Sequence, residues 1–184
     1  YDFYNYAGLA RSVYLFSVPR NSVEDVTVVT DFSGTKGQVS YEVVTTASAE
    51  VKTTLIDESQ KVVATGTGSK SVLEIENVKL WQPGNAYLYV LKIEVVVDGA
   101  VVDEYSLNVG VRTVKVEGNK FLVNGEPFYF TGFGMHEDHV VKGKGHDNSF
   151  MVNDFELLKW VGANSFRTSH YPYAEEVMDY ADRM

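Results

Sequence analysis

Two short polar segments near the C-terminal end of the sequence carry side chains suited to binding a polar ligand. The first is "GFGMHEDH", residues 132–139, which supplies an imidazole followed by two carboxylates. The second is "NSFRTSHYPYAEE", residues 164–176, in which a guanidinium, an imidazole and two phenols follow one another closely. Because these groups donate and accept hydrogen bonds, we expect a site for a polar ligand lined by His136, Glu137, Asp138, Arg167, His170 and Tyr171.

Each polar segment is associated with an apolar run that predicts a β-strand. The run "FYFT", residues 128–131, precedes the first segment, and "SFRTS", residues 165–169, carries the Arg of the second. In parallel barrels the active-site groups gather at the C-terminal ends of the strands. Each segment taken alone is typical of a polar loop. Because the two segments occupy matching positions on consecutive predicted strands, we expect their side chains to meet at one rim of the predicted barrel.

Two helices are predicted around the second of these strands. Asn153 is the expected N-cap of the first helix, with Glu156 three residues later as in a capping box and Gly162 as its stop. The second helix has an apolar stripe of Val177, Tyr180 and Ala181. Strand, loop, helix, strand, helix is typical of the beginning of a parallel α/β fold. A (β/α)₈ barrel needs about eight such units and roughly 250 residues, so we expect the chain to be a fragment.

The preceding residues predict a different fold. From residue 20 to residue 112, Val, Thr and Tyr alternate with polar residues at period two, in short runs separated by turn signals. The Asp98-Gly99 pair is typical of a tight hairpin. Seven short strands in about 90 residues favour an immunoglobulin-like β-sandwich.

The expected fold class is therefore multidomain β plus α/β. The immunoglobulin-like sandwich is followed by the first units of a (β/α)₈ TIM barrel, which open with a hairpin turning at Asn124-Gly125. The segment "SVYLF", residues 12–16, reads as a strand at the end of a preceding domain. The expected domains are residues 1–19, 20–112 and 113–184.

The composition disfavours several classes of function. The formal net charge is −9, whereas a nucleic-acid-binding protein needs a basic face. No apolar run approaches the length of a membrane span. The sequence contains no Cys, which excludes disulfides and thiolate metal sites and fits a reducing compartment. We expect a cytoplasmic protein without nucleic-acid or membrane partners.

Other motif interpretations are weaker. His136 and His139 are three residues apart, unlike the two His of an HExxH zinc site, and upstream glycines disfavour a helix there. Glu175 and Glu176 are helix neighbours that diverge, and acids in a first turn suit the helix dipole. The loop "KGKGHD", residues 142–147, lacks the P-loop spacing. We expect no metal and no cofactor.

Longer motifs identify a family. The run "NSFRTSHYPYAEEVMDYAD" resembles the signature of family 2 glycoside hydrolases. The segment "LWQPGNAYLY" is similar to a motif of that family's sandwich, and "GVRTVKVEGNKFLVNGEPFYFTGFGMHED" to its junction between sandwich and barrel. The opening "YDFYNYAGLARSV" resembles the close of the family's N-terminal jelly-roll sugar-binding domain. The resemblance covers essentially the whole chain.

Within the family, the motifs most resemble bacterial members that hydrolyse β-D-glucuronides. This resemblance implies a retaining mechanism, with one Glu as acid/base and another as nucleophile of a covalent glycosyl-enzyme intermediate. Both are expected downstream of Met184, so this chain supplies no catalytic residue and is expected to be inactive alone. A small-molecule glucuronide is the implied partner, and a homo-tetramer is the implied assembly of the full-length enzyme.

The same resemblance implies supporting roles for residues of this chain. Asp2 matches a carboxylate that bonds sugar hydroxyls, and His136 matches a His that contacts the sugar. Arg167 and His170 match residues that line the site, with Arg167 orienting a catalytic carboxylate through charge-assisted hydrogen bonds. The remaining candidates brace the site: Glu137, Asp138 and Tyr171.

Two alternatives stay open. One is another family 2 glycosidase, such as a β-galactosidase or a galacturonidase, which a downstream Asn-x-Lys pair would disfavour. The other is a non-catalytic carbohydrate-binding or adhesion module built on residues 20–112.

Overall fold

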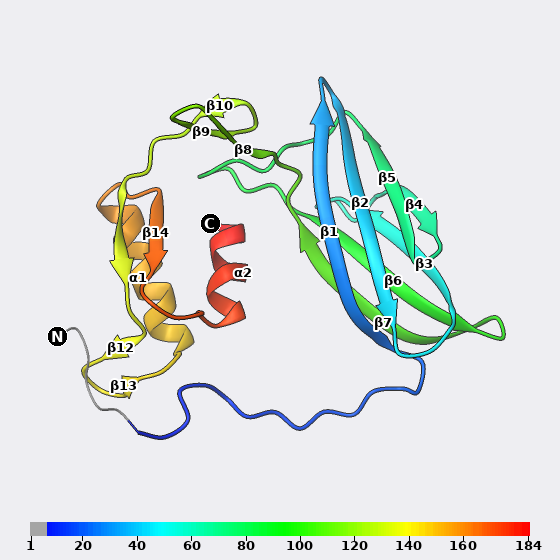
Figure 1. Ribbon diagram of the computed structural model, residues 1–184, viewed down its shortest axis with the longest axis horizontal. Helices are drawn as coiled ribbons and strands as arrows, with labels where there is room; N and C mark the ends of the chain where they lie inside the picture. The colour runs from blue at the N-terminus through cyan, green and yellow to red at the C-terminus, as the bar shows by residue number, and fades with distance from the viewer. Residues whose placement is uncertain (1–6) are drawn as a thin grey trace. The chain divides into compact units, whose positions relative to one another are not determined.

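A computed structural model describes residues 7–184 of the chain, which form two compact units. Phe16–Phe128 form one unit, called here the sandwich unit. Residues 7–15 and Tyr129–Met184 form the other, called here the α/β unit. Each unit is shown in Figure 1, and each is described by itself. The expected domain boundary at residue 112 stays a prediction.

The sandwich unit consists of antiparallel strands in two sheets, as the alternating pattern predicted. One sheet has the strand order β1-β2-β5, and the other has the order β4-β3-β6-β7 (Figure 1). The strands are β1 (Val23–Ser33), β2 (Lys36–Thr45), β3 (Glu50–Ile56), β4 (Val62–Thr67), β5 (Lys70–Glu76), β6 (Tyr89–Val97) and β7 (Ala100–Val109).

The alternating residues of the inner strands form the core of this unit. Along β2, every second residue is buried, and the same is true of the first half of β6. Successive side chains of a strand point to opposite faces, so one face of each sheet is apolar. Val39, Leu55, Leu91 and Ile93 are completely buried in the resulting cluster.

The predicted tight turns are confirmed by backbone geometry. Asp98 and Gly99 have φ angles of 52° and 80°, and they join β6 to β7. Asn124 and Gly125 have φ angles of 54° and 81°, and they join β9 to β10. Both pairs occupy the left-handed region that two-residue hairpins of this type require.

A three-stranded hairpin sheet completes the sandwich unit. It comprises β8 (Val114–Glu117), β9 (Lys120–Val123) and β10 (Glu126–Pro127). The Asn124 side chain donates a hydrogen bond to the Trp81 carbonyl at 2.9 Å and accepts one from the Thr113 amide at 3.0 Å. The turn residue therefore ties this small sheet to the loop that precedes β6.

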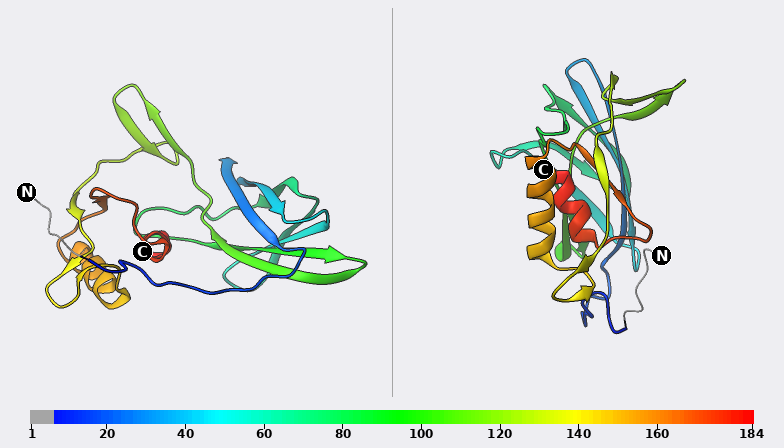
Figure 2. Two further views of the ribbon diagram at one scale, coloured as in Figure 1. Left: turned by 60° about the horizontal axis from the view of Figure 1, so that its bottom comes forward. Right: turned by 90° about the vertical axis from the view of Figure 1, so that its left-hand side faces the viewer.

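The α/β unit contains the parallel strand pair that the sequence predicted. β11 (Gly132–Met135) pairs in parallel with β14 (Ser165–Thr168), with Gly132 opposite Ser165 and Met135 opposite Thr168. The other elements are β12 (Asp138–His139), β13 (Gly143–Lys144), α1 (Asn148–Trp160) and α2 (Glu175–Arg183). In Figures 1 and 2, α1 and α2 lie side by side, and the rings of Phe155 and Tyr180 meet edge to face at 5.0 Å.

The predicted start of the first parallel strand is wrong by four residues. We expected residues 128–131 to form it, but the strand begins at Gly132. The Asn164 side chain explains the difference, because it donates to the Tyr129 carbonyl at 2.9 Å and accepts from the Thr131 amide at 2.8 Å. These side-chain bonds take the place of a strand ladder before Gly132.

The predicted N-cap of α1 is also wrong. The helix begins at Asn148, and its N-cap is Asp147, whose carboxylate accepts from the amides of Ser149 at 2.9 Å and Phe150 at 3.2 Å. Asn153 therefore lies inside the helix. An Asp outside the helix satisfies two of the free amides of the first turn. The predicted stop at Gly162 is confirmed, since Gly162 has a φ of 77° just after the C-cap.

Residues 12–16, predicted to form a strand, have no regular secondary structure. No strand within residues 7–184 pairs with them, and their large apolar side chains are exposed. Among the described residues, no helix combines the length and apolar character needed to cross a bilayer.

Candidate functional site

The parallel pairing brings the two predicted polar segments to one rim of the α/β unit. His136 directly follows the last residue of β11, and His170 lies two residues beyond the end of β14. Their imidazole rings meet edge to face, with centroids 5.7 Å apart. A guanidinium nitrogen of Arg167 lies 3.1 Å from Nδ1 of His170. Three of the predicted site residues are therefore neighbours.

These three side chains are accessible to a ligand. Arg167 and His170 are exposed, and the His136 side chain is 34% exposed. A guanidinium has five N–H donors, and one of them faces His170. Arg167 therefore keeps donors for a further acceptor, while the two imidazoles offer both donor and acceptor nitrogens.

Glu137 lies next to His136 in the sequence but is directed into the unit. Its side chain is 8% exposed, and it lies 3.4 Å from the Arg11 guanidinium. The Ala174 amide, at the start of α2, donates to its carboxylate at 3.3 Å, and the His146 imidazole is 3.9 Å away. A carboxylate so engaged fits the bracing role predicted for Glu137 and is not placed to reach a ligand at the rim.

Asp138 contacts the imidazole that precedes it in the sequence. One carboxylate oxygen lies 3.7 Å from Nδ1 of His136, an ion pair when the imidazole is protonated. The other oxygen is buried and has no hydrogen-bond partner among the described residues. Asp138 is therefore positioned to influence the orientation of the His136 ring.

Tyr171 contacts the rim through its hydroxyl. Its oxygen accepts a hydrogen bond from the Glu137 amide at 2.8 Å, and the Lys144 ammonium lies 4.1 Å from the ring centroid. Burial raises the pKa of the Tyr171 phenol, which stays protonated at neutral pH. The contact supports the backbone just after His136, in line with the bracing role predicted for Tyr171.

Sequence reasoning missed several residues that hold this rim. Tyr173 is buried, and its hydroxyl donates to the Met135 carbonyl. Arg11 is 126 residues from Glu137, so no local pattern connects them. The alternating phenols of "YPY" were a usable signal for Tyr173, because they place two rings on one side of an extended segment.

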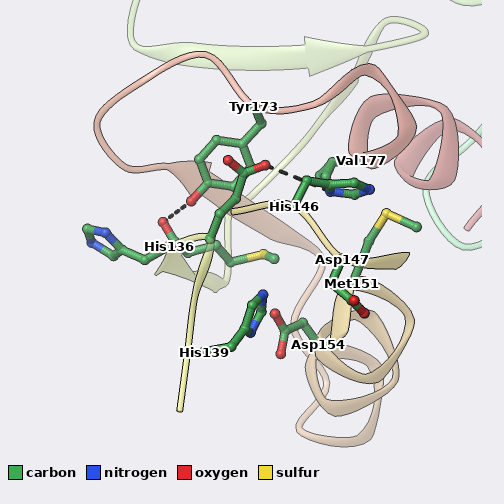
Figure 3. A pocket seen from close by; sticks show the side chains of 10 residues that line it. His136, His139, His146, Asp147, Met151, Asp154, Tyr173 and Val177 are labelled. Carbon is green, nitrogen blue, oxygen red and sulfur yellow. Dashed lines mark hydrogen bonds and ion pairs between the residues drawn. The ribbon is translucent and has the colours of Figure 1, made fainter. Parts of the chain in front are cut away.

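A small cavity lies beneath the rim (Figure 3). It is lined by His136, His139, His146, Asp154 and Tyr173 among others, and its volume is about 20 Å³. That is room for about one water molecule and far too little for a sugar ring. This cavity is therefore too small to be the expected sugar pocket.

The imidazoles of this cavity have partners within the unit. His139 stacks on Phe150 with centroids 4.0 Å apart, and Figure 3 shows it beside Asp154. Burial raises the pKa of the Asp154 carboxyl, and the nearby His139 opposes that rise. No cluster of three or more metal-binding side chains suited to a metal occurs in residues 7–184.

Asp2 was also predicted to reach the pocket, but it lies outside the described residues. Glu175 and Glu176 are exposed in the first turn of α2, where their charges face the positive end of the helix dipole. The roles of all the predicted site residues stay predictions.

Family models match both parts of the chain. The model described as "Glycosyl hydrolases family 2" matches residues 21–112, and "Glycosyl hydrolases family 2, TIM barrel domain" matches residues 114–184. The predicted resemblance is confirmed. The predicted fold class is confirmed as well, since the sandwich is followed by the start of a TIM-barrel domain that contains β11 and β14.

Curated relatives and solved structures agree with these matches. The β-glucuronidase of Paenibacillus borealis is 52% identical over 185 residues, and that of Homo sapiens is 47% identical over 193 residues. Both alignments cover 100% of this chain, which spans 31% and 30% of the length of these two relatives. The β-glucuronidase of Ruminococcus gnavus, solved in complex with D-glucuronic acid, is 45% identical with a TM-score of 0.96, covering 100% of this chain and 32% of that one.

Proposed function

We propose that this chain, which belongs to glycosyl hydrolase family 2, is part of a retaining enzyme that hydrolyses β-D-glucuronides and releases glucuronic acid. The observation that carries the proposal is the rim formed by His136, His170 and Arg167 at the C-terminal ends of adjacent parallel strands. In TIM barrels, this is the face that holds the active site. The full-chain similarity to β-glucuronidases supports the choice of substrate.

The rim residues suit recognition and support, whereas the bond-breaking carboxylates must come from elsewhere. A retaining enzyme uses two carboxylates about 5–5.5 Å apart. Glu137 is engaged by Arg11 and by the start of α2, and Glu175 and Glu176 are adjacent on a helix surface. We infer that both catalytic glutamates belong to later barrel strands, where the free donors of Arg167 would orient one of them.

The charge of the chain makes local cations important. Its formal net charge of −9 opposes an anionic sugar at long range. Arg167 is exposed at the rim, so its guanidinium would offset part of that repulsion where the ligand binds. The remaining length of the enzyme would supply the Asn-x-Lys pair that reads the sugar carboxylate.

Exposed apolar side chains in the α/β unit support the inference that further barrel elements cover it. Phe133 on β11 is 58% exposed, and Trp160 at the end of α1 is 82% exposed. Parallel strands are usually covered on both faces, so these side chains mark surfaces that other strands and helices would bury. The tetramer and the cytoplasmic location stay predictions.

The test is a substrate comparison on the complete protein. Chromogenic β-D-glucuronide, β-D-galactoside and β-D-galacturonide would be offered at equal concentration. We expect turnover of the glucuronide above the other two, and turnover of either alternative in its place would contradict the proposal. The 184-residue chain assayed alone is expected to be inactive.

A further inference from the structure

Two tyrosines separated by one proline stack on each other beside the rim. The rings of Tyr171 and Tyr173 have centroids 5.3 Å apart and an angle of 24° between their planes. Tyr173 is buried, and the Lys144 ammonium lies over the ring of Tyr171. Each ring therefore restricts the other, and both hydroxyls have fixed positions.

The two hydroxyls hold the backbone on opposite sides of one residue. The Tyr173 hydroxyl donates to the Met135 carbonyl, an interaction drawn as a dashed line in Figure 3. The Tyr171 hydroxyl oxygen accepts from the Glu137 amide at 2.8 Å. Met135 and Glu137 are the residues before and after His136. Both peptide groups that flank His136 are thus bound to a phenol, which restricts the φ and ψ angles of His136.

The Tyr173 hydroxyl also reaches the residue that follows β14. The Ser169 amide donates to the Met135 carbonyl at 3.2 Å, and the Tyr173 hydroxyl lies 3.5 Å from the Ser169 carbonyl. Ser169 is buried and precedes His170. One phenol therefore links the positions directly before both rim imidazoles.

The environment keeps these bonds intact at neutral pH. Burial raises the pKa of the Tyr173 phenol well above its ordinary value, and it also raises the pKa of Tyr171. Tyr173 must keep its proton to donate to a carbonyl. A hydrogen bond made in a buried site also loses little to competing water.

We propose that Tyr171 and Tyr173 are positioning residues, which clamp the peptide groups on either side of His136 and thereby orient its imidazole toward the sugar. The inference rests on the proposed function only for the ligand, since the clamp itself is built from contacts within the chain. In this proposal the phenols act through His136, because their hydroxyls bind the peptide groups on either side of it.

The decisive experiment is a double-mutant cycle on the complete protein. Tyr173→Phe keeps the ring and removes only the hydroxyl, and we expect it to lower kcat/KM for a chromogenic β-D-glucuronide about tenfold. In a His136→Ala background, the same change is expected to have less than about a twofold effect, because the residue it acts through is gone. An equal loss in both backgrounds, or no loss in either, would overturn the proposal.

Tyr171→Phe is the second variant, and Tyr129→Phe is the matched control because its side chain is 83% exposed in the same unit. Tyr171→Phe should follow Tyr173→Phe in the cycle, and the control should leave kcat/KM unchanged.

An isotope-labelled histidine NMR spectrum gives a readout that does not depend on turnover. The His136 signal, identified by its loss in His136→Gln, should move in both clamp variants and not in the control.

The two readouts separate the clamp from the proposed function. Absence of glucuronide turnover by the complete wild-type protein would refute the proposed function, and the His136 signal would still test the clamp. An unmoved His136 signal in both Phe variants would refute the clamp, whether or not the protein hydrolyses glucuronides.

Discussion

The two units of this chain differ in what their buried groups do. In the sandwich unit, Leu91 and Ile93 are completely buried within a large aliphatic cluster. In the α/β unit, the buried hydrophobic residues all retain some exposure, from 3% at Val177 to 9% at Tyr173. The α/β unit also buries a carboxylate, Glu137, beside the Arg11 guanidinium and the His146 imidazole. One unit is organised around apolar contact, and the other around polar bonds near a rim.

This difference indicates which unit contributes most of the folding stability and which unit positions the polar side chains of the rim. Antiparallel strands close to one another in sequence build the sandwich, so its core is complete within the unit. The α/β unit is held instead by the short parallel pair β11–β14 and by bonds between distant residues, such as Arg11 with Glu137 and Asn164 with Thr131. Such bonds place functional side chains accurately but contribute less buried apolar area, which is the main source of folding free energy.

The largest expected effect is a difference between the two units in whether each folds when it is expressed alone. Residues 16–128 expressed alone should fold, because their core is self-contained, whereas residues 129–184 alone should not. Urea unfolding followed by circular dichroism would measure both. A cooperative transition in the isolated 129–184 segment would break the comparison.

A core substitution should then show how much the sandwich depends on apolar packing. Leu91→Ala is expected to lower the free energy of unfolding of the sandwich unit by about 2–5 kcal/mol, because it leaves a cavity in a site with no exposure. Val72→Thr, at a side chain 51% exposed, is the control and should stay within about 0.5 kcal/mol. Similar losses from both substitutions would show that burial does not set the cost.

A rim substitution should affect chemistry and leave stability nearly unchanged. In the complete protein, Arg167→Ala is expected to lower turnover at least about tenfold, or about 1.4 kcal/mol. Its melting temperature should stay close to that of the wild type, since Arg167 is exposed. Lys159→Ala, an exposed cation in the last turn of α1, serves as control. Unchanged kinetics in Arg167→Ala would remove this residue from the site.

The smallest expected effect concerns the cap of α1. The Lys142 ammonium and the amides of the first turn lower the pKa of Asp147 from 3.8 to about 2. A lowered carboxyl pKa gives stability that is present above pH 3.8 and is lost as the pH falls toward 2. Asp147→Asn keeps an N-cap side chain but removes the charge.

The measurement is the melting temperature of the complete protein against pH. Asp147→Asn should melt slightly below the wild type at neutral pH, and the difference should shrink as the pH falls below 3.8. Asp147→Ala removes the cap as well and should show a loss at every pH. A constant difference between the wild type and Asp147→Asn would mean that the charge of Asp147 contributes nothing to stability.

The sequence by itself determined the features that depend on neighbouring residues. Period-two alternation predicted β1 to β7, and the pairs Asp98-Gly99 and Asn124-Gly125 predicted tight turns. These predictions succeeded because side-chain direction in a strand and the φ angles of a turn are set within a few residues. The meeting of His136 and His170 followed from the same reasoning, once two parallel strands were expected.

Only the tertiary structure decided which of several polar side chains would form hydrogen bonds with free backbone groups. Asp147 rather than Asn153 caps α1, and the Asn164 side chain delays the start of β11. Likewise, the Tyr173 hydroxyl reaches a carbonyl 38 residues away. The bonds of Asn164 and Tyr173 join side chains to distant backbone groups, and their free energy depends on where packing has brought the two partners. The sequence contains the donors and acceptors but does not specify which of them pair. Folding decides the pairs, because a polar group that is buried without a partner raises the free energy of the folded state.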